Sequence, residues 1–188
     1  MPEQSGRWKI NIKWLRSLPS KDGANNPERI DKMRITEYRT KINKENNLNE
    51  LVKEKVLNYQ TDIKALTSPD AIANMMNAVY YMNERAEEYL FMIALDTKNK
   101  PIGVFEISHG TVNSSLLSPR EVFIRAILAG AVSIVLIHNH PSGDPAPSRE
   151  DIQVTKRISE VGQLMGIKLL DHIIIGDYYK SLREEGII

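Results

Sequence analysis

Residues 132–151 read VSIVLIHNHPSGDPAPSRED, and this stretch decides the fold. The run before His138 is apolar and rich in β-branched residues, which is typical of a buried strand. Three prolines and a glycine then indicate a stiff loop. Ser148 is a favourable helix N-cap, so the following residues are expected to be helical as far as about Met165. A buried strand, a loop and a helix in this order predict a sheet with helices packed on it.

The sequence on both sides continues this pattern. Residues 88–110 contain two apolar runs separated by a turn-like stretch at 96–100, which predicts a β-hairpin. Pro69, after Ser68, and Pro119 each occupy the first position of an expected amphipathic helix. A strand is expected over 167–176, and a short strand pair over 177–188. The element order β-β-α-β-α-β-β predicts an α/β domain over residues 67–188.

The first 66 residues differ in character from the rest. Residues 1–47 are polar and interrupted by prolines and glycine, which predicts a partly disordered N-terminal extension. Within it, residues 8–14 alternate in the manner of a short strand. Residues 48–66 are expected to form a connecting helix or linker.

Composition narrows the class of protein. The net charge of +1 excludes a strongly polyelectrolyte chain. The absence of cysteine excludes disulfides and thiolate nucleophiles, and it fits a reducing compartment. No secretory signal is found, and the longest apolar run is shorter than the ~20 residues that span a bilayer. We therefore expect a cytoplasmic protein without membrane contact. A weak DNA contact is expected only locally, through the basic arm at residues 1–21.

His138 and His140 lie two residues apart at the end of the expected strand. Side chains at this spacing point to the same face, so both imidazoles can bind one ion. Pro141 favours extended backbone at His140. Asp151, in the first turn of the next helix, can supply a third ligand. Three protein ligands leave the fourth position of a zinc ion to water, as in catalytic sites.

Each of these residues also has a simpler interpretation. Ser148 and Asp151 have nearly the spacing of a capping box, which requires no metal, and both roles can hold together. Glu106 stands in a mainly apolar strand and is either the base for the metal-bound water or an ordinary outward-facing acid. Asp144 is a competing ligand, although Asp144-Pro145 fits a turn.

The chain contains two further histidines, His109 and His172. His109 is expected to be exposed, or to lie beside the ligands without binding the ion. Asp171 and His172 are expected either to orient a ligating imidazole or to form a satisfied pair in the core.

Taken together, Glu106, His138, His140, Ser148 and Asp151 resemble the JAMM motif of JAB/MPN zinc metallopeptidases. The stretches HGTVNSSLLSPREVFIRAI, HNHPSGDPAPSREDI and LLDHIIIG resemble its RadC branch more narrowly. The resemblance extends over 67–188 and matches the motif spacing in full.

The resemblance implies a cytidine-deaminase-like α/β fold that holds one Zn²⁺ through His138, His140 and Asp151. Glu106 would act as general base and acid, and Ser148 would polarise the scissile carbonyl. The implied activity is hydrolysis of peptide or isopeptide bonds in a protein substrate. The RadC branch also carries a historical DNA-repair label, so the alternative is a DNA- or protein-binding accessory module with structural or vestigial zinc. The helix-hairpin-helix found upstream in many members is not recognisable here, which disfavours general DNA binding.

Overall fold

The computed structural model describes residues 32–110 and 117–188. Its elements are β1 (Lys32–Ile42), β2 (Asn49–Gln60), α1 (Pro69–Tyr80), a 3-10 turn η1 (Met82–Glu84), β3 (Tyr89–Leu95), β4 (Pro101–His109), α2 (Pro119–Leu128), β5 (Ser133–Asn139), α3 (Arg149–Met165), β6 (Lys168–Ile175) and β7 (Tyr179–Ser181). This α/β architecture confirms the predicted fold class. No helix among the described residues is long and apolar enough to cross a membrane.

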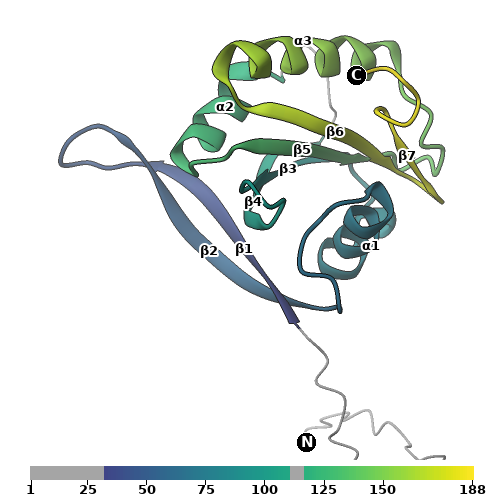
Figure 1. The fold of residues 1–188 in the computed structure, drawn as a ribbon, viewed down its shortest axis with the longest axis horizontal. Coiled ribbons are helices and arrows are strands. Elements are labelled where there is room, and N and C mark those ends of the chain that lie inside the picture. The colour runs from purple at the N-terminus through teal and green to yellow at the C-terminus, as the bar shows by residue number, and fades with distance from the viewer. Residues whose placement is uncertain (1–31, 111–116) are drawn as a thin grey trace, which may run out of the picture.

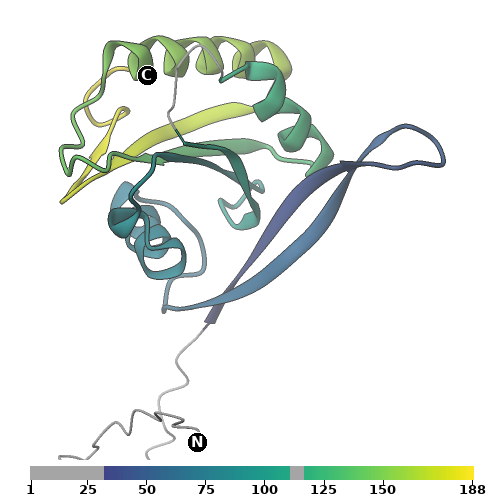
Figure 2. The same cartoon turned by 180° about the vertical axis from the view of Figure 1, so that it is seen from behind.

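The strands form one mixed sheet in the order β2-β1-β4-β3-β5-β6-β7. Helix α1 covers one face, and α2 and α3 cover the other (Figures 1 and 2). Successive strand side chains alternate between these faces, so the sheet contributes to two cores. Phe91 and Ile137 pack in the core beneath α1. Leu90, Leu136 and Ile158 pack in the core beneath α2 and α3.

Local sequence sets the helix boundaries, and Ser148 caps its helix as predicted. Ser68 and Ser118 are the N-caps of the other two helices, and each of the three side chains accepts a hydrogen bond from a backbone N–H in the first turn. Proline opens α1 and α2. Gly166 ends α3 in the left-handed conformation, which glycine adopts without a steric penalty.

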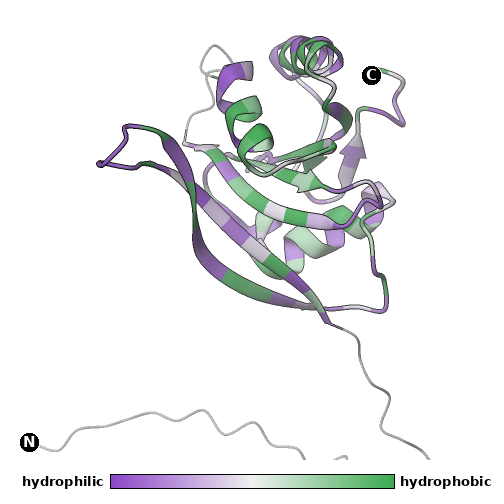
Figure 3. Cartoon of the chain, turned by 60° about the vertical axis from the view of Figure 1, so that its left-hand side comes forward, coloured by the Kyte–Doolittle hydropathy of each residue, from purple (hydrophilic) through white to green (hydrophobic). Residues whose placement is uncertain are grey.

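The region before α1 corrects the sequence-based expectation. Residues 32–60, expected to be extension and linker, form a long antiparallel hairpin. Met33 and Ile35 anchor β1 in the α1 core. Across the hairpin, Lys41 lies 2.8 Å from the Glu50 carboxylate, so charged residues that suggested a linker pair between strands. Figure 3 shows hydrophobic and hydrophilic residues interleaved along it.

Two other expectations concern the chain ends. The alternating stretch at residues 8–14 lies outside the described residues. Of the strand pair expected over 177–188, one short strand, β7, forms, and it pairs with β6. The remainder is a turn followed by the C-terminal residues. Leu182 is fully buried, so this end packs against the body of the domain.

Candidate metal centre

His138 and His140 lie where β5 ends and the following loop begins. His138 is opposite Leu90 of β3, whose side chain belongs to the α2 and α3 core. Alternation therefore directs both imidazoles to the face covered by α3. Asp151 reaches them from the first turn of that helix. The structure thus brings together the three side chains predicted as ligands. Two come from the end of β5 and one from the first turn of α3, and a loop separates these elements in sequence.

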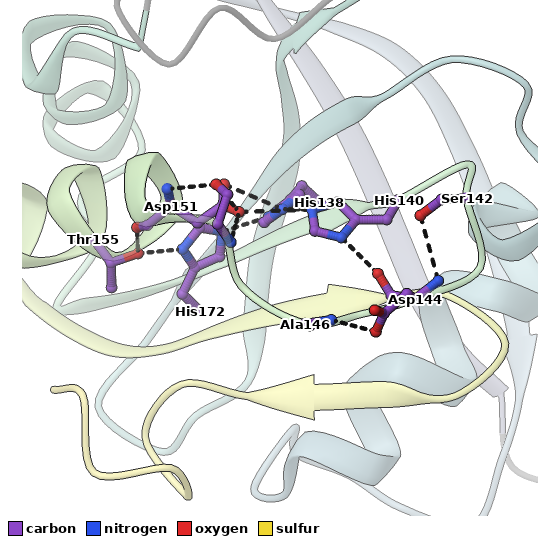
Figure 4. Close-up of polar contacts among 9 residues, drawn as sticks. His138, His140, Ser142, Asp144, Ala146, Asp151, Thr155 and His172 are labelled. Carbon is purple, nitrogen blue, oxygen red and sulfur yellow. Dashed lines mark hydrogen bonds and ion pairs between the residues drawn. The ribbon is translucent and has the colours of Figure 1, made fainter.

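The three side chains present one ligand atom each within 4.8 Å of one another. His138 Nε2 is 3.0 Å from His140 Nε2, and 3.4 Å from Asp151 Oδ1. His140 Nε2 is 3.6 Å from Asp151 Oδ2. Ligands of a tetrahedral zinc ion, each bound at about 2.0–2.2 Å, lie about 3.3–3.5 Å apart. The three separations are close to this spacing, with Oδ1 of Asp151 nearest His138 and Oδ2 nearest His140, so the three side chains can converge on one ion (Figure 4).

The loop after His140 is attached to the end of β6. The His140 N–H donates to the Ile175 carbonyl at 2.8 Å, and the Asp177 N–H donates to the Gly143 carbonyl at 2.7 Å. Asp144 uses its side chain within the loop, where it accepts from the Ala146 N–H. Its backbone carbonyl faces His140 Nδ1 at 2.8 Å. Asp144 thus orients His140, a predicted ligand, through its backbone, and its carboxylate is not part of the cluster of His138, His140 and Asp151.

Asp151 is held by the capping box that the sequence suggested. Its backbone N–H donates to Ser148 Oγ at 3.0 Å, and its Oδ2 accepts from the Ser148 N–H at 2.8 Å. Ser148 Oγ also lies 2.6 Å from Oδ2. Burial acts to raise the pKa of Asp151, but hydrogen bonds with His138 and His140 outweigh it and lower that pKa far below its ordinary value. The carboxylate is therefore ionised and aimed at the imidazoles.

The pair Asp171–His172 divides between the two faces of the sheet. The His172 ring lies against His138, with Nε2 2.8 Å from His138 Nδ1. Asp171 accepts instead from Ser181 Oγ and from two backbone N–H groups. Burial lowers the pKa of His172 well below its ordinary value, so this imidazole is neutral. His172 thus contacts a ligand, whereas Asp171 is a satisfied polar residue of the core.

Glu106, the expected base, is not among the side chains whose ligand atoms lie within 4.8 Å of one another. Glu106 is opposite Phe91, whose side chain belongs to the α1 core, so alternation directs Glu106 to the face away from α3. Its carboxylate lies 2.7 Å from His109 Nδ1. His109 is exposed, as expected, and stacks on Tyr89.

A different acid, Glu88, influences one of the three side chains through its charge. Glu88 lies two residues before Leu90, the strand partner of His138, just as His140 lies two residues after His138. Hydrogen bonds with Asp151 raise the pKa of His140; partial burial opposes this, and the charge of Glu88 adds to it. Glu88 is half-buried. Sequence reasoning missed it because it precedes the strand and has no spacing relation to the histidines.

Asn139 fixes the backbone around Glu88. Its side chain accepts from the Tyr89 N–H at 2.8 Å and donates to the Glu87 carbonyl at 3.0 Å. Asn139 is 1% exposed and lies between the two histidines in sequence. The residue between the ligands therefore clamps the segment that carries the additional acid.

Comparisons with known proteins identify the family. The model of the RadC-like JAB domain matches residues 66–187. A UPF0758 protein of Clostridium acetobutylicum is 49% identical over 124 residues, covering 65% of this chain and 53% of the relative. A UPF0758 protein of Caldanaerobacter subterraneus subsp. tengcongensis is 46% identical over 138 residues, covering 73% and 58%. The match thus spans little more than half of each relative. The chain belongs to the family of RadC-like JAB domains.

Proposed function

We propose that this protein is a zinc-dependent hydrolase of peptide or isopeptide bonds. The observation that carries the proposal is the convergence of His138 Nε2, His140 Nε2 and the Asp151 carboxylate, which lie within 3.6 Å of one another. Two nitrogen donors and one carboxylate suit zinc, and three protein ligands suit a catalytic rather than a structural ion. Membership of a JAB-domain family supports the same activity.

In this proposal, different residues of the chain have different roles in amide hydrolysis. His138, His140 and Asp151 hold the ion, which supplies a water of lowered pKa and a Lewis acid for the substrate carbonyl. A carboxylate beside the site receives the proton of the attacking water and returns it to the leaving nitrogen. The hydroxyl of Ser148 donates to Asp151 Oδ2 at 2.6 Å, and it would turn to the carbonyl oxygen as negative charge develops.

Two carboxylates compete for the role of proton carrier. Motif spacing indicates Glu106, whereas strand pairing favours Glu88. Glu106 faces the α1 side and is engaged by His109. Glu88 is close enough to His140 for its charge to affect that imidazole. We therefore propose Glu88 as general base and acid, and Glu106 serves as the matched comparison.

The test combines metal content with a search for cleavage products. Wild type, Asp151→Ala, Glu88→Gln and Glu106→Gln are each purified after zinc loading, and bound metal is measured by mass spectrometry. Each protein is then incubated with a denatured bacterial proteome, and new peptide N-termini are identified after chemical labelling. We expect about one zinc per chain in all but Asp151→Ala. New termini should appear with wild type and Glu106→Gln only.

Other outcomes would contradict specific parts of the proposal. Wild type without zinc after metal loading would contradict the metal site itself. Zinc-loaded wild type that yields no new termini, also against isopeptide-linked ubiquitin dimers, would contradict the hydrolase assignment. Loss of cleavage in Glu106→Gln but not in Glu88→Gln would return the base to the residue that the motif indicates.

A basic cavity favours a second candidate function, the binding of nucleic acid. Lys32, Arg34, Lys64 and Lys100 line a cavity of about 350 Å³ that no acidic residue lines. Lys32 directly follows the segment that carries the basic arm, so both could contact one phosphate backbone. If they do, affinity for double-stranded DNA should fall steeply with added salt, and the double variant Lys64→Ala/Lys100→Ala should lower this slope by about 2. No binding at low salt would contradict it.

A further inference from the structure

A chain of buried hydrogen bonds leads away from the metal centre. His138 Nδ1 is 2.8 Å from His172 Nε2, and His172 Nδ1 is 2.6 Å from Thr155 Oγ1. Thr155 Oγ1 is 2.5 Å from the backbone carbonyl of Asp151. The three side chains come from β5, β6 and α3, and none is more than 4% exposed. The chain thus begins at one ligand and returns to the helix turn that carries another (Figure 4).

The chemistry of the atoms sets the direction of every proton in this chain. A carbonyl oxygen can only accept, so the Thr155 hydroxyl must donate its single proton to Asp151. Thr155 Oγ1 can then only accept from His172, whose Nδ1 must carry a proton. The His172 ring is 1% exposed, and its nitrogens contact Thr155 and His138 rather than a carboxylate, so the ring is uncharged and has one N–H. His172 Nε2 is therefore an acceptor. His138 Nδ1 must therefore carry the proton of that ring, which leaves the lone pair of Nε2 free.

We propose that Thr155 and His172 are positioning residues that hold His138 in the tautomer able to bind metal. His140 is held in the same tautomer more simply, because its Nδ1 faces the carbonyl of Asp144. Both Nε2 lone pairs then point at the position between the rings and the Asp151 carboxylate. The inference rests on the proposed metal site, because it explains why these nitrogens are presented as ligands.

The consequence is a loss of affinity on removing a single hydroxyl group. In Thr155→Val the shape of the side chain is kept, but His172 Nδ1 loses its acceptor. His172 is then free to carry its proton on Nε2 and donate it to His138, which must place its own proton on the atom that binds metal. Loss of such a supporting partner weakens metal binding by about 10- to 100-fold. Thr155→Ser keeps the hydroxyl and should bind metal as wild type does.

The experiment compares wild type, Thr155→Val and Thr155→Ser by two measurements. Zinc affinity is measured by competition with a chromophoric chelator. The tautomer of each histidine is measured in the zinc-free protein by long-range ¹H–¹⁵N correlation NMR, with His138→Gln to assign the signal. We expect the Nδ1–H tautomer of His138 in wild type and Thr155→Ser, a shift toward Nε2–H in Thr155→Val, and the corresponding 10- to 100-fold loss of zinc affinity in that variant alone.

The outcomes separate this inference from the proposed function. If wild type binds zinc and Thr155→Val binds it equally tightly, the relay is refuted and the metal site stands. If wild type binds no zinc, the proposed function fails, while the NMR measurement still tests the tautomer. An Nε2–H tautomer of His138 in the zinc-free wild type would overturn the relay even if the valine variant did not fold.

Discussion

Gly176, directly after β6, tests how the residues of the proposed metal centre are held in place. A Cβ atom at this position would lie 2.2 Å from the carbonyl oxygen of Gly143, and real Cβ contacts essentially never fall below 3.0 Å. In Gly176→Ala the loop must therefore retreat by at least about 0.8 Å (3.0 minus 2.2). The displaced peptide accepts from the Asp177 N–H, and its neighbour Asp144 accepts from His140 Nδ1. Both bonds should break or lengthen.

The size of the effect follows from these two contacts. Overpacking costs about 1–3 kcal/mol, and a lost backbone hydrogen bond costs about 1 kcal/mol. We therefore expect the free energy of unfolding to fall by about 2–4 kcal/mol, and Tm to fall by about 5–15 °C for a chain of this length. Ligand distances in a metal site tolerate about 0.2 Å, so zinc affinity should fall at least about tenfold.

Gly130→Ala is the matched control. Gly130 has a φ of +66°, and no atom lies within 4 Å of a Cβ there. Its replacement should cost about 1–2 kcal/mol through backbone strain alone and leave zinc affinity unchanged. Thermal unfolding and chelator competition measure both quantities. Should Gly176→Ala bind zinc as tightly as Gly130→Ala, the loop does not position His140, and the reasoning is refuted.

Three other perturbations test the packing of the core, the interaction of His140 with Asp151, and the hydrogen bonds of the Asn139 side chain. Leu136 is fully buried, so Leu136→Ala should lower the free energy of unfolding, measured by urea titration, by about 2–5 kcal/mol. Leu164 is 88% exposed, so Leu164→Ala should change this free energy by less than about 0.5 kcal/mol. Equal effects of the two substitutions would contradict the described core. A hydrogen bond with Asp151 raises the pKa of His140 in the folded protein. The positive charge of His140 therefore stabilises the fold fully below the pKa of an unfolded histidine, about 6.5, and this stabilisation is lost as pH rises through the pKa of the folded protein. Zinc-free wild type should therefore lose stability as pH rises above about 6.5, and His140→Gln should lose less over the same rise; equal pH dependence would refute this. Asn139→Ala should retain zinc but lower turnover, because the segment before β3 loses its side-chain clamp; unchanged turnover would contradict a role for Glu88.

The features that the sequence predicted correctly are those fixed by local spacing. The serine caps and the opening prolines act within one helical turn, and the shared face of His138 and His140 follows from strand geometry alone. The hairpin of β1 and β2 could not be predicted in this way, because its charged residues are stabilised by partners on the opposite strand. Lys55, for example, lies 3.0 Å from the nearly buried Glu37 carboxylate.

The position of Glu106 required information that strand patterning does not contain. Both faces of β4 are covered, so Val104 and Phe105 are equally buried and alternation gives no sign of which face carries α3. Only the pairing of β3 with both β4 and β5 relates the two faces to each other. Glu88 becomes a candidate through that same pairing, because it lies two residues before the partner of His138.

The arrangement of the centre implies that metal binding and folding stability are coupled. When both imidazoles are neutral and in the Nδ1–H tautomer, two nitrogen lone pairs and a carboxylate converge within 3.6 Å without a donor between them. Such an arrangement is unfavourable in the absence of a cation, so the surrounding fold must hold it in place. It does so through the capping box of α3, the loop attached to β6 and the buried chain from His172 to Thr155. A cation that binds only this folded arrangement stabilises the fold in proportion to the logarithm of its concentration, which makes the same contacts responsible for affinity and for stability.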